Sequence, residues 1–302
     1  MEKIEKIDIH AHVTAYPELI PPHIKTGCPF LGAEQQIAFY DDIGIEKGVL
    51  LPIVAPEAQW AILPNEPSKL IADRYPDRFL WFCNVDPRMG NNRDSTDFSY
   101  LLEHYKRLGA KGMGELTSNL WADDPKMDRL YSCLEDLDMP LLIHVAPGFD
   151  GYYGIVDDLG LPRLEKMLKA HPRLKWIGHS LCFWSEISAD NDESIRHRMP
   201  KGKVQEGRLS YFMRTYENLY CDLSANSGKN AMMRDPEFAA AFMEEFSDRI
   251  LYGCDVCGAC NTFMYEFDEF LTSLRESGAI KESTYRKIVR ENAIKLLSLD
   301  KV

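Results

Sequence analysis

The chain has 302 residues, 45% of them hydrophobic, with a formal charge of -12 at pH 7 and an isoelectric point near 5.2. This negative charge disfavours nucleic acid and anionic membrane surfaces as partners. The sequence contains no apolar run near the roughly 20 residues that span a bilayer, and its start, MEKIEKIDIH, lacks the apolar stretch of a secretory signal. Eight scattered cysteines then favour reduced thiols over a disulfide framework. We therefore expect a globular cytoplasmic protein.

A short β-rich run, a turn and a segment of helical period recur along the chain. The eight predicted strands are Ile4–His12, Gly48–Pro52, Phe79–Pro87, Ala110–Leu116, Pro140–Pro147, Leu174–Leu181, Asn218–Ala225 and Ile250–Val256. Predicted helices between and after them include Pro125–Leu137, Leu161–His171, Pro236–Phe246, Phe263–Ser277 and Glu282–Ser298. Several strands are apolar on both faces, as buried parallel strands are. Eight βα units predict an α/β fold, a (β/α)8 TIM barrel formed as a single domain by residues 1–302.

The first predicted strand ends in Ile-Asp-Ile-His-Ala-His. Residues two apart on a strand share a face, so His10 and His12 are predicted to point together into the barrel mouth. Two imidazoles at this spacing can reach one cation. In a barrel of this kind, chemistry sits where strands end.

Three later strands also end in residues that bind metals. They place His144, His179 and Asp255 at the ends of the fifth, sixth and eighth predicted strands. A lone strand histidine is more often a hydrogen-bonded core residue, but the combination at four strand ends predicts a metal site. In the fourth strand the period of two places Glu115 near the mouth, as a ligand, as a hydrogen-bond partner of a ligand histidine, or in an internal ion pair with Lys111.

Asp255 lies within a run of three cysteines, Cys254, Cys257 and Cys260. Iron–sulfur and closed zinc sites need a fourth ligand, and none follows this run. Alternation along the strand directs Cys254 towards the helical layer when Asp255 faces the mouth. We therefore assign the chemistry to Asp255 and interpret the cysteines as bystanders.

The pattern His10-Ala11-His12, His144, His179 and Asp255 resembles the amidohydrolase superfamily of metal-dependent barrel enzymes. The chain is most similar to the amidohydrolase-related branch that includes aminocarboxymuconate-semialdehyde decarboxylase, whose terminal helix the stretch 291–297 resembles. The resemblance implies His10, His12, His144 and Asp255 as metal ligands, with His179 beside them as ligand or substrate-polarising group. It also implies that Glu115 can bridge a second ion. We expect zinc, with manganese as the alternative, and one ion, with two as the alternative. A homodimer is expected from the resemblance alone.

Two reactions fit such a site. In hydrolysis, a metal-bound water attacks an amide or lactone, with Asp255 moving the proton and His179 binding the carbonyl oxygen. In non-oxidative decarboxylation, Asp255 protonates the carbon that loses carbon dioxide from a small hydroxy- or amino-substituted acid. The motifs do not separate the two reactions. We favour the broader assignment as a hydrolase, with the carboxy-lyase as the first alternative and a non-catalytic binding barrel as the second.

Loop residues suggest the kind of substrate. Aromatic and basic side chains follow several strands, and a small planar or anionic carbonyl compound would suit them. Besides His179, the candidate substrate-binding residues are Trp184, Tyr152 and Asn226. The alternative interpretation is that these side chains pack the loops onto the barrel or onto a second subunit.

Overall fold

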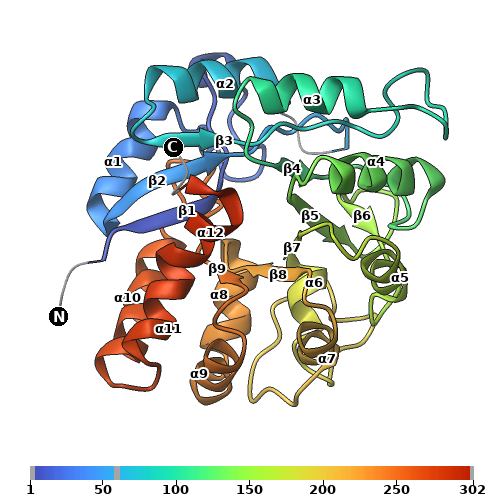
Figure 1. Cartoon of the computed structure of the whole chain (residues 1–302). Helices are drawn as coiled ribbons and strands as arrows, with labels where there is room; N and C mark the ends of the chain where they lie inside the picture. The colour runs from blue at the N-terminus through green and yellow to red at the C-terminus, as the bar shows by residue number, and fades with distance from the viewer. Residues whose placement is uncertain (1–3, 58–61, 300–302) are drawn as a thin grey trace.

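The computed structural model describes residues 4–57 and 62–299, which form eight principal strands surrounded by helices (Figure 1). These strands are β1 (Lys6–Ala11), β2 (Ile45–Leu50), β3 (Phe79–Trp81), β4 (Met113–Leu116), β5 (Leu141–Ala146), β7 (Trp176–His179), β8 (Leu219–Asp222) and β9 (Ile250–Leu251). All eight predicted strands are confirmed, although most are shorter than the apolar runs that predicted them. A further short strand, β6 (Ile155–Val156), pairs with β5 and was not predicted.

The strands run parallel in two sheets, β1-β2-β3 and β4-β5-β7-β8-β9. Backbone hydrogen bonds bridge both gaps between the sheets. Between β3 and β4, the amide of Gly114 donates to the carbonyl of Cys83 over 2.9 Å; between β9 and β1, the amide of Ile9 donates to Tyr252 over 3.0 Å. The ring of eight parallel strands is a (β/α)8 barrel.

Helices cover the outside of the ring (Figure 1). Those before β5 are the short η1 (Pro17–Leu19), α1 (Ala33–Ile43), α2 (Asn65–Arg74), α3 (Ser99–Arg107) and α4 (Pro125–Asp136). Those after it are α5 (Pro162–Ala170), α6 (Leu181–Ser185), α7 (Arg208–Thr215), α8 (Ala225–Met233), α9 (Pro236–Glu245) and α10 (Phe263–Glu276). The predicted helix Glu282–Ser298 is three consecutive pieces: α11 (Glu282–Arg286), a π-helical turn η2 (Lys287–Glu291) and α12 (Asn292–Leu297). The other four predicted helices are confirmed to within a residue or two at each end.

The barrel interior is apolar below the mouth. One buried cluster joins side chains of β1, β2, β5, β7 and β9 with three of α12: Ile7, Ile9, Val49, Leu51, Phe82, Leu142, Ile177, Leu251, Ala293, Leu296 and Leu297. The terminal helix therefore closes the end of the barrel opposite the strand C-termini, where loops build the site.

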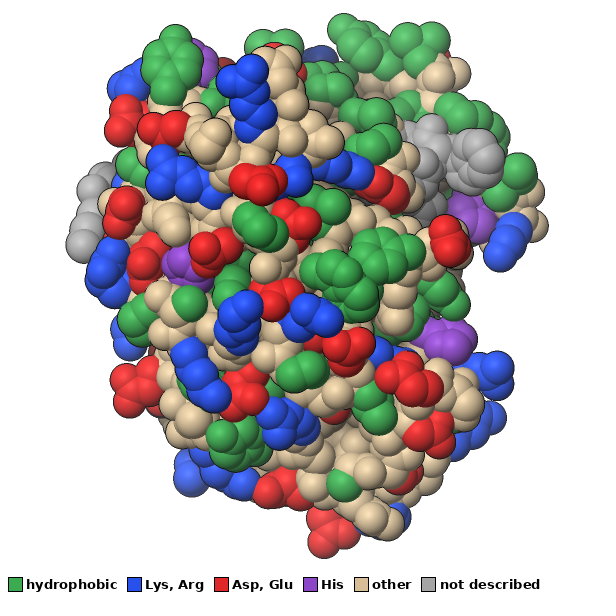
Figure 2. Space-filling view, turned by 90° about the vertical axis from the view of Figure 1, so that its right-hand side faces the viewer, with side chains coloured by type: hydrophobic (Ala, Val, Ile, Leu, Met, Phe, Trp, Pro, Cys, Tyr) green, Lys and Arg blue, Asp and Glu red, His purple; other side chains and the backbone are tan. Residues whose placement is uncertain are grey.

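The surface mixes charges of both signs. On the face shown in Figure 2, acidic and basic side chains are interspersed and hydrophobic side chains form small separate groups. Ion pairs such as that of Arg163 with Asp123 over 2.8 Å tie neighbouring segments on the surface. Within 4–57 and 62–299, no helix has the length and apolar character needed to cross a membrane.

Substitution of Gly48 on β2 tests the packing of Tyr40 against β1 and β2. A Cβ there would lie 1.9 Å from the hydroxyl of Tyr40, which donates to the buried Asp8 carboxylate over 2.7 Å. We expect Gly48→Ala to displace Tyr40 and to lower the free energy of unfolding by about 1–3 kcal/mol, measured by urea denaturation. Gly148→Ala, where a Cβ meets nothing within 4 Å, is the control and should change stability little. Equal stability of both variants would show that Tyr40 gives way freely.

Candidate metal centre and active site

His10 and His12 lie at the end of β1, and the Nδ1 atom of each ring is hydrogen-bonded to an oxygen atom of a neighbouring segment. The His10 Nδ1 lies 2.7 Å from a carboxylate oxygen of Asp222 at the end of β8. The His12 Nδ1 lies 2.9 Å from the carbonyl oxygen of Leu51. The pairing of β1 with β2 shifts register between Asp8 and Ala11, and such irregularities re-aim side chains beside active sites.

These contacts fix the protons of both rings. A carbonyl only accepts hydrogen bonds, so the His12 Nδ1 carries the hydrogen. Burial raises the pKa of Asp222, but the charge and hydrogen bond of His10 outweigh burial and hold that pKa well below its usual range. The His10 Nδ1 therefore donates to an ionised carboxylate. In the neutral rings both Nε2 atoms present lone pairs, and they face each other across 3.0 Å.

Two facing lone pairs repel unless a positive charge lies with them. Burial lowers the pKa of His10, but the negative charges of Asp255 and Asp222 outweigh it and raise the pKa well above its ordinary value. The surroundings thus favour a cation at this place, either a proton or a metal ion. Nitrogen ligands of this kind suit zinc and other divalent transition metals.

Glu115 reaches the same point from β4. One carboxylate oxygen lies 3.2 Å from the His12 Nε2, and the other lies 2.6 Å from the Nδ1 of His144 on β5. Burial raises the pKa of Glu115, but the charge of His144 and hydrogen bonds from the histidines outweigh it and hold the pKa well below its usual range. Burial also lowers the pKa of His144. The pair therefore places an ionised carboxylate within hydrogen-bond distance of the His144 imidazole.

His179 ends β7 on the other side of the cluster. Its Nδ1 lies 2.9 Å from the hydroxyl of Ser224, which donates to Asp222 over 2.6 Å. Its Nε2 points to the centre, 3.8 Å from Glu115 and 3.7 Å from Asp255. Asp222 and Ser224 thus orient two histidines at once, a role the sequence pattern did not assign to them.

Asp255 completes the ring of polar groups after β9. Its amide donates to the carbonyl of His10 over 2.8 Å, and its backbone lies in the left-handed region with φ of 52°. Such conformations cluster at functional sites in residues other than glycine. One carboxylate oxygen lies 3.6 Å from both His10 Nε2 and His12 Nε2. With 22% of the side chain exposed, this carboxylate links the buried cluster to the solvent-accessible mouth.

Three overlapping groups of side chains in the described residues have geometry suited to a metal ion. They are His10, His12 and Glu115; His10, His179 and Asp255; and Glu115, His144 and His179. All six residues were predicted for the site, and the structure brings all six together. The donor set of imidazole nitrogens and carboxylates, with the back nitrogens of the β1 histidines already bound, fits a divalent ion.

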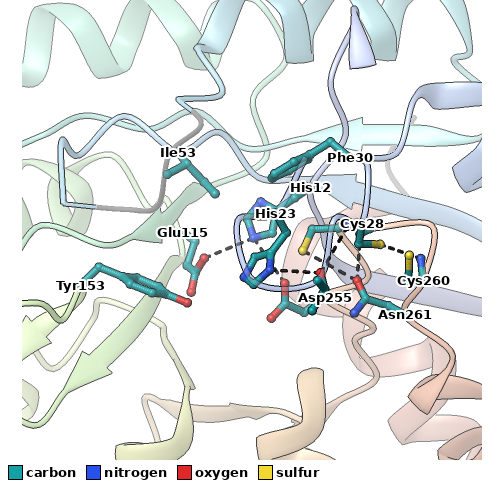
Figure 3. Close-up of a pocket in the computed structure, with 13 residues that line it drawn as sticks. His12, His23, Cys28, Phe30, Ile53, Glu115, Tyr153, Asp255, Cys260 and Asn261 are labelled. Carbon is teal, nitrogen blue, oxygen red and sulfur yellow. Dashed lines mark hydrogen bonds and ion pairs between the residues drawn. The ribbon is translucent and has the colours of Figure 1, made fainter. Parts of the chain in front are cut away.

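Two cavities open beside this cluster and share Asp255. The first, of about 310 Å³, is lined by polar and apolar side chains including His12, Glu115, Phe30, Ile53, Tyr153 and Cys28 (Figure 3). The second, of about 470 Å³, includes His144, His179, Tyr152 and Asn226 in its lining. Tyr153, Cys257 and Asn261 border both. A small planar molecule at the cluster would therefore meet aromatic and amide side chains on either side of Asp255.

The candidate substrate-binding residues separate into two groups. His179, Tyr152 and Asn226 line the second cavity. Trp184 does not line either one: it is 2% exposed, and its indole nitrogen donates to the carbonyl of Asp222 over 2.9 Å. Tyr153, whose ring centroid lies 4.4 Å from that of His144, was not singled out. Its neighbour Tyr152 carries the same aromatic signal, so sequence alone could not choose between them.

A family model described as amidohydrolase matches residues 7–299. No curated protein sequence matches the chain. Among solved structures, an uncharacterised TIM-barrel protein from Bordetella bronchiseptica has a TM-score of 0.66 at 18% identity, covering 99% of this chain and 100% of its own. This likeness supports the barrel fold.

Two decarboxylases share the fold as well. The 2,6-dihydroxybenzoate decarboxylase from Rhizobium has a TM-score of 0.58 at 19% identity, covering 98% of this chain and 99% of its own. The 5-carboxyvanillate decarboxylase from Novosphingobium aromaticivorans, solved with manganese and 4-hydroxy-3-methoxy-5-nitrobenzoic acid, has a TM-score of 0.61 at 17% identity, covering 97% and 96%.

Asp222 offers a test of the orientation of His10. We expect Asp222→Asn to weaken the binding of Mn²⁺ or Zn²⁺ about 10- to 100-fold, because the ring loses the carboxylate that fixes its proton. Competition with a chelator measures this affinity. Asp157→Asn is a matched control: Asp157 is equally buried, but it accepts from backbone amides at the start of α5. A similar loss of affinity in both variants would mean that the effect comes from general destabilisation.

Proposed function

Because the chain belongs to the amidohydrolase family of enzymes, we propose that it is a metal-dependent carboxy-lyase that removes carbon dioxide from a small hydroxy-substituted aromatic acid. The sequence alone favoured hydrolysis of an amide or lactone. Structural neighbours that are named as decarboxylases of dihydroxybenzoate and carboxyvanillate support the alternative better. The substrate class is taken from what those proteins act on, and the cavity lining is compatible with it.

In this proposal His10, His12 and Asp255 hold one divalent ion, with Glu115, His144 and His179 completing its surroundings. Manganese is our first choice, because the 5-carboxyvanillate decarboxylase was solved with it; zinc is the alternative. When bound, the ion supplies the positive charge that draws in a carboxylate and an adjacent hydroxyl group of the substrate.

One observation carries the choice of Asp255 as acid. Among the carboxylates of the cluster, it is the one that borders both cavities, and it is more exposed than Glu115, at 22% against 5%. A general acid must lie within reach of the atom it protonates. Asp255 meets that requirement from either cavity.

The proposed reaction moves one proton and breaks one bond. Protonated Asp255 gives its proton to the ring carbon that bears the carboxylate, a carbon–hydrogen bond forms, and the bond to the carboxylate breaks to release carbon dioxide. The electron pair of the broken carbon–carbon bond returns to the ring and restores its aromaticity. Asp255 is left ionised and regains a proton from water through its exposed side.

The neighbouring side chains position the acid substrate. His179 presents its Nε2 towards the centre and hydrogen-bonds a substrate oxygen as charge moves in the ring. Phe30, Ile53 and Tyr153 line the first cavity and exclude water from the faces of the aromatic ring.

The proposal is tested by loading the protein with Mn²⁺ and screening hydroxybenzoates and methoxy-hydroxybenzoates for carbon dioxide release. Amides and lactones are screened in parallel for hydrolysis. Carbon dioxide release that stops on chelation and returns with Mn²⁺ supports the carboxy-lyase. Hydrolysis without carbon dioxide release would support the amidohydrolase-type reaction instead, and binding without turnover would support a binding protein.

Asp255→Asn is expected to reduce turnover by at least about a thousandfold, since the amide cannot donate an acidic proton. Metal content, measured by atomic emission, should largely persist because the histidines and Glu115 are unchanged. Asp158→Asn is the control: this surface carboxylate is 57% exposed and lines neither cavity, so the variant should keep full activity. Activity in Asp255→Asn near that of the unmodified protein would remove Asp255 from its catalytic role.

A further inference from the structure

Two loop segments meet edge to edge at the first cavity. Residues 28–31 follow β1 and residues 257–260 follow β9, and Phe30 faces Gly258 in an antiparallel bridge. The amide of Leu31 donates to Cys257 over 3.0 Å, and the amide of Ala259 donates to Pro29 over 3.1 Å. These two bonds flank the bridge, so Phe30 and Gly258 form a pair that is not itself hydrogen-bonded.

Cys28 and Cys260 lie beside this bridge, although the strand pairing does not continue to them. The loop turns directly after Gly258, because the amide of Asn261 donates to the carbonyl of Gly258 over 2.9 Å, and Ala259 and Cys260 form the middle of that turn. The turn brings the backbone of Cys260 against the side chain of Cys28 on the facing segment.

Local contacts show how near the two cysteines lie. The amide of Cys260 donates to the Sγ of Cys28 over 2.8 Å. A Cβ on Gly258 would lie 2.9 Å from that Sγ, so the glycine leaves room for the thiol. Figure 3 shows Cys28 and Cys260 next to each other at one side of the cavity. Cys28 is buried, whereas Cys260 is exposed.

We propose that Cys28 and Cys260 form a redox-modifiable thiol pair that small-molecule disulfides, such as oxidised glutathione, convert into a disulfide joining the two loops. The exposed Cys260 thiolate attacks the small disulfide, forming a mixed disulfide and releasing one thiol. The Cys28 thiolate then attacks the Cys260 sulfur and releases the second thiol. Two protein thiols are oxidised and one small disulfide is reduced to two thiols.

The disulfide would join the two loops that frame the first cavity. Cys28 and Cys260 both line this cavity, as do His23 and Thr26 upstream of the first and Asp255 upstream of the second. Oxidation therefore fixes the wall opposite Tyr153 and reduces its freedom to move. A reducing compartment keeps the pair as thiols and the wall adjustable.

Cys257 provides a matched control within the same loop. It also lines the cavity, but the register places it opposite Leu31, and its Sγ faces the amide oxygen of Asn261. These contacts predict that Cys257 stays reduced while Cys28 and Cys260 are oxidised.

The experiment incubates the full-length protein in glutathione buffers of increasing oxidation, blocks free thiols with an alkylating reagent and maps disulfides by mass spectrometry. We expect two of the eight thiols to be lost, with a peptide joining Cys28 to Cys260. Cys257→Ser should give the same crosslink. Cys260→Ser and Cys28→Ser should each abolish it, leaving at most a mixed disulfide with glutathione.

Thermal unfolding measures how far the disulfide stabilises the protein. The crosslink joins residues 232 positions apart, so the oxidised protein should melt roughly 5–10 °C higher than the reduced protein. Cys260→Ser should show no such shift. A crosslink that involves Cys257, or glutathione mixed disulfides alone in the unmodified chain, would overturn the proposal. None of these readouts depends on the enzymatic reaction proposed above.

Discussion

The site depends on two imidazole lone pairs that are forced to face each other. The rings of His10 and His12 cannot turn away, because their Nδ1 atoms are bound by Asp222 on β8 and by Leu51 at the end of β2. The two Nε2 atoms lie 3.0 Å apart. The arrangement is stable only with a positive charge at that point, and it requires β1 to lie between strands that come from distant parts of the chain. Barrel closure is therefore a condition for the chemistry as well as for the fold.

The surrounding carboxylates also favour a positive charge at this point. Glu115, Asp222 and Asp255 converge on a largely buried space, where uncompensated negative charge is costly. The histidines offset part of it: the charges of Asp255 and Asp222 raise the pKa of His10 against the effect of burial. A divalent ion would satisfy the lone pairs and the carboxylates together. Asp255 differs from the others by its exposure to the mouth, which in our proposal lets it exchange a proton with solvent as well as border the ion.

Much of the site could be predicted from the alternation of side chains along the strands. His10, His12, His144 and His179 stand at the ends of apolar runs, and the structure brings them together with Glu115 and Asp255. The bond of Asp222 to His10 was not predicted, because it depends on how β8, β9 and β1 are aligned side by side in the barrel. Trp184 looked like a loop aromatic over the site, yet the turn into α6 buries it. Strand positions follow from local pattern, whereas partners across strands and in loops follow from tertiary packing.

Closure of the barrel also explains why the contacts of the cysteines after β9 could not be predicted from the spacing of that cysteine run alone. The spacing of Cys254, Cys257 and Cys260 suggests a local cluster, but strand alternation and the loop pairing separate them. Because β9 lies beside β1, the loop after one meets the loop after the other, and Cys260 finds Cys28 rather than Cys257. The same adjacency brings Asp255 to His10 through a backbone hydrogen bond of 2.8 Å. The adjacency of β9 and β1 thus places both Asp255 and the thiol pair of Cys28 and Cys260. A disulfide between the two loops would therefore act directly on the wall of the first cavity.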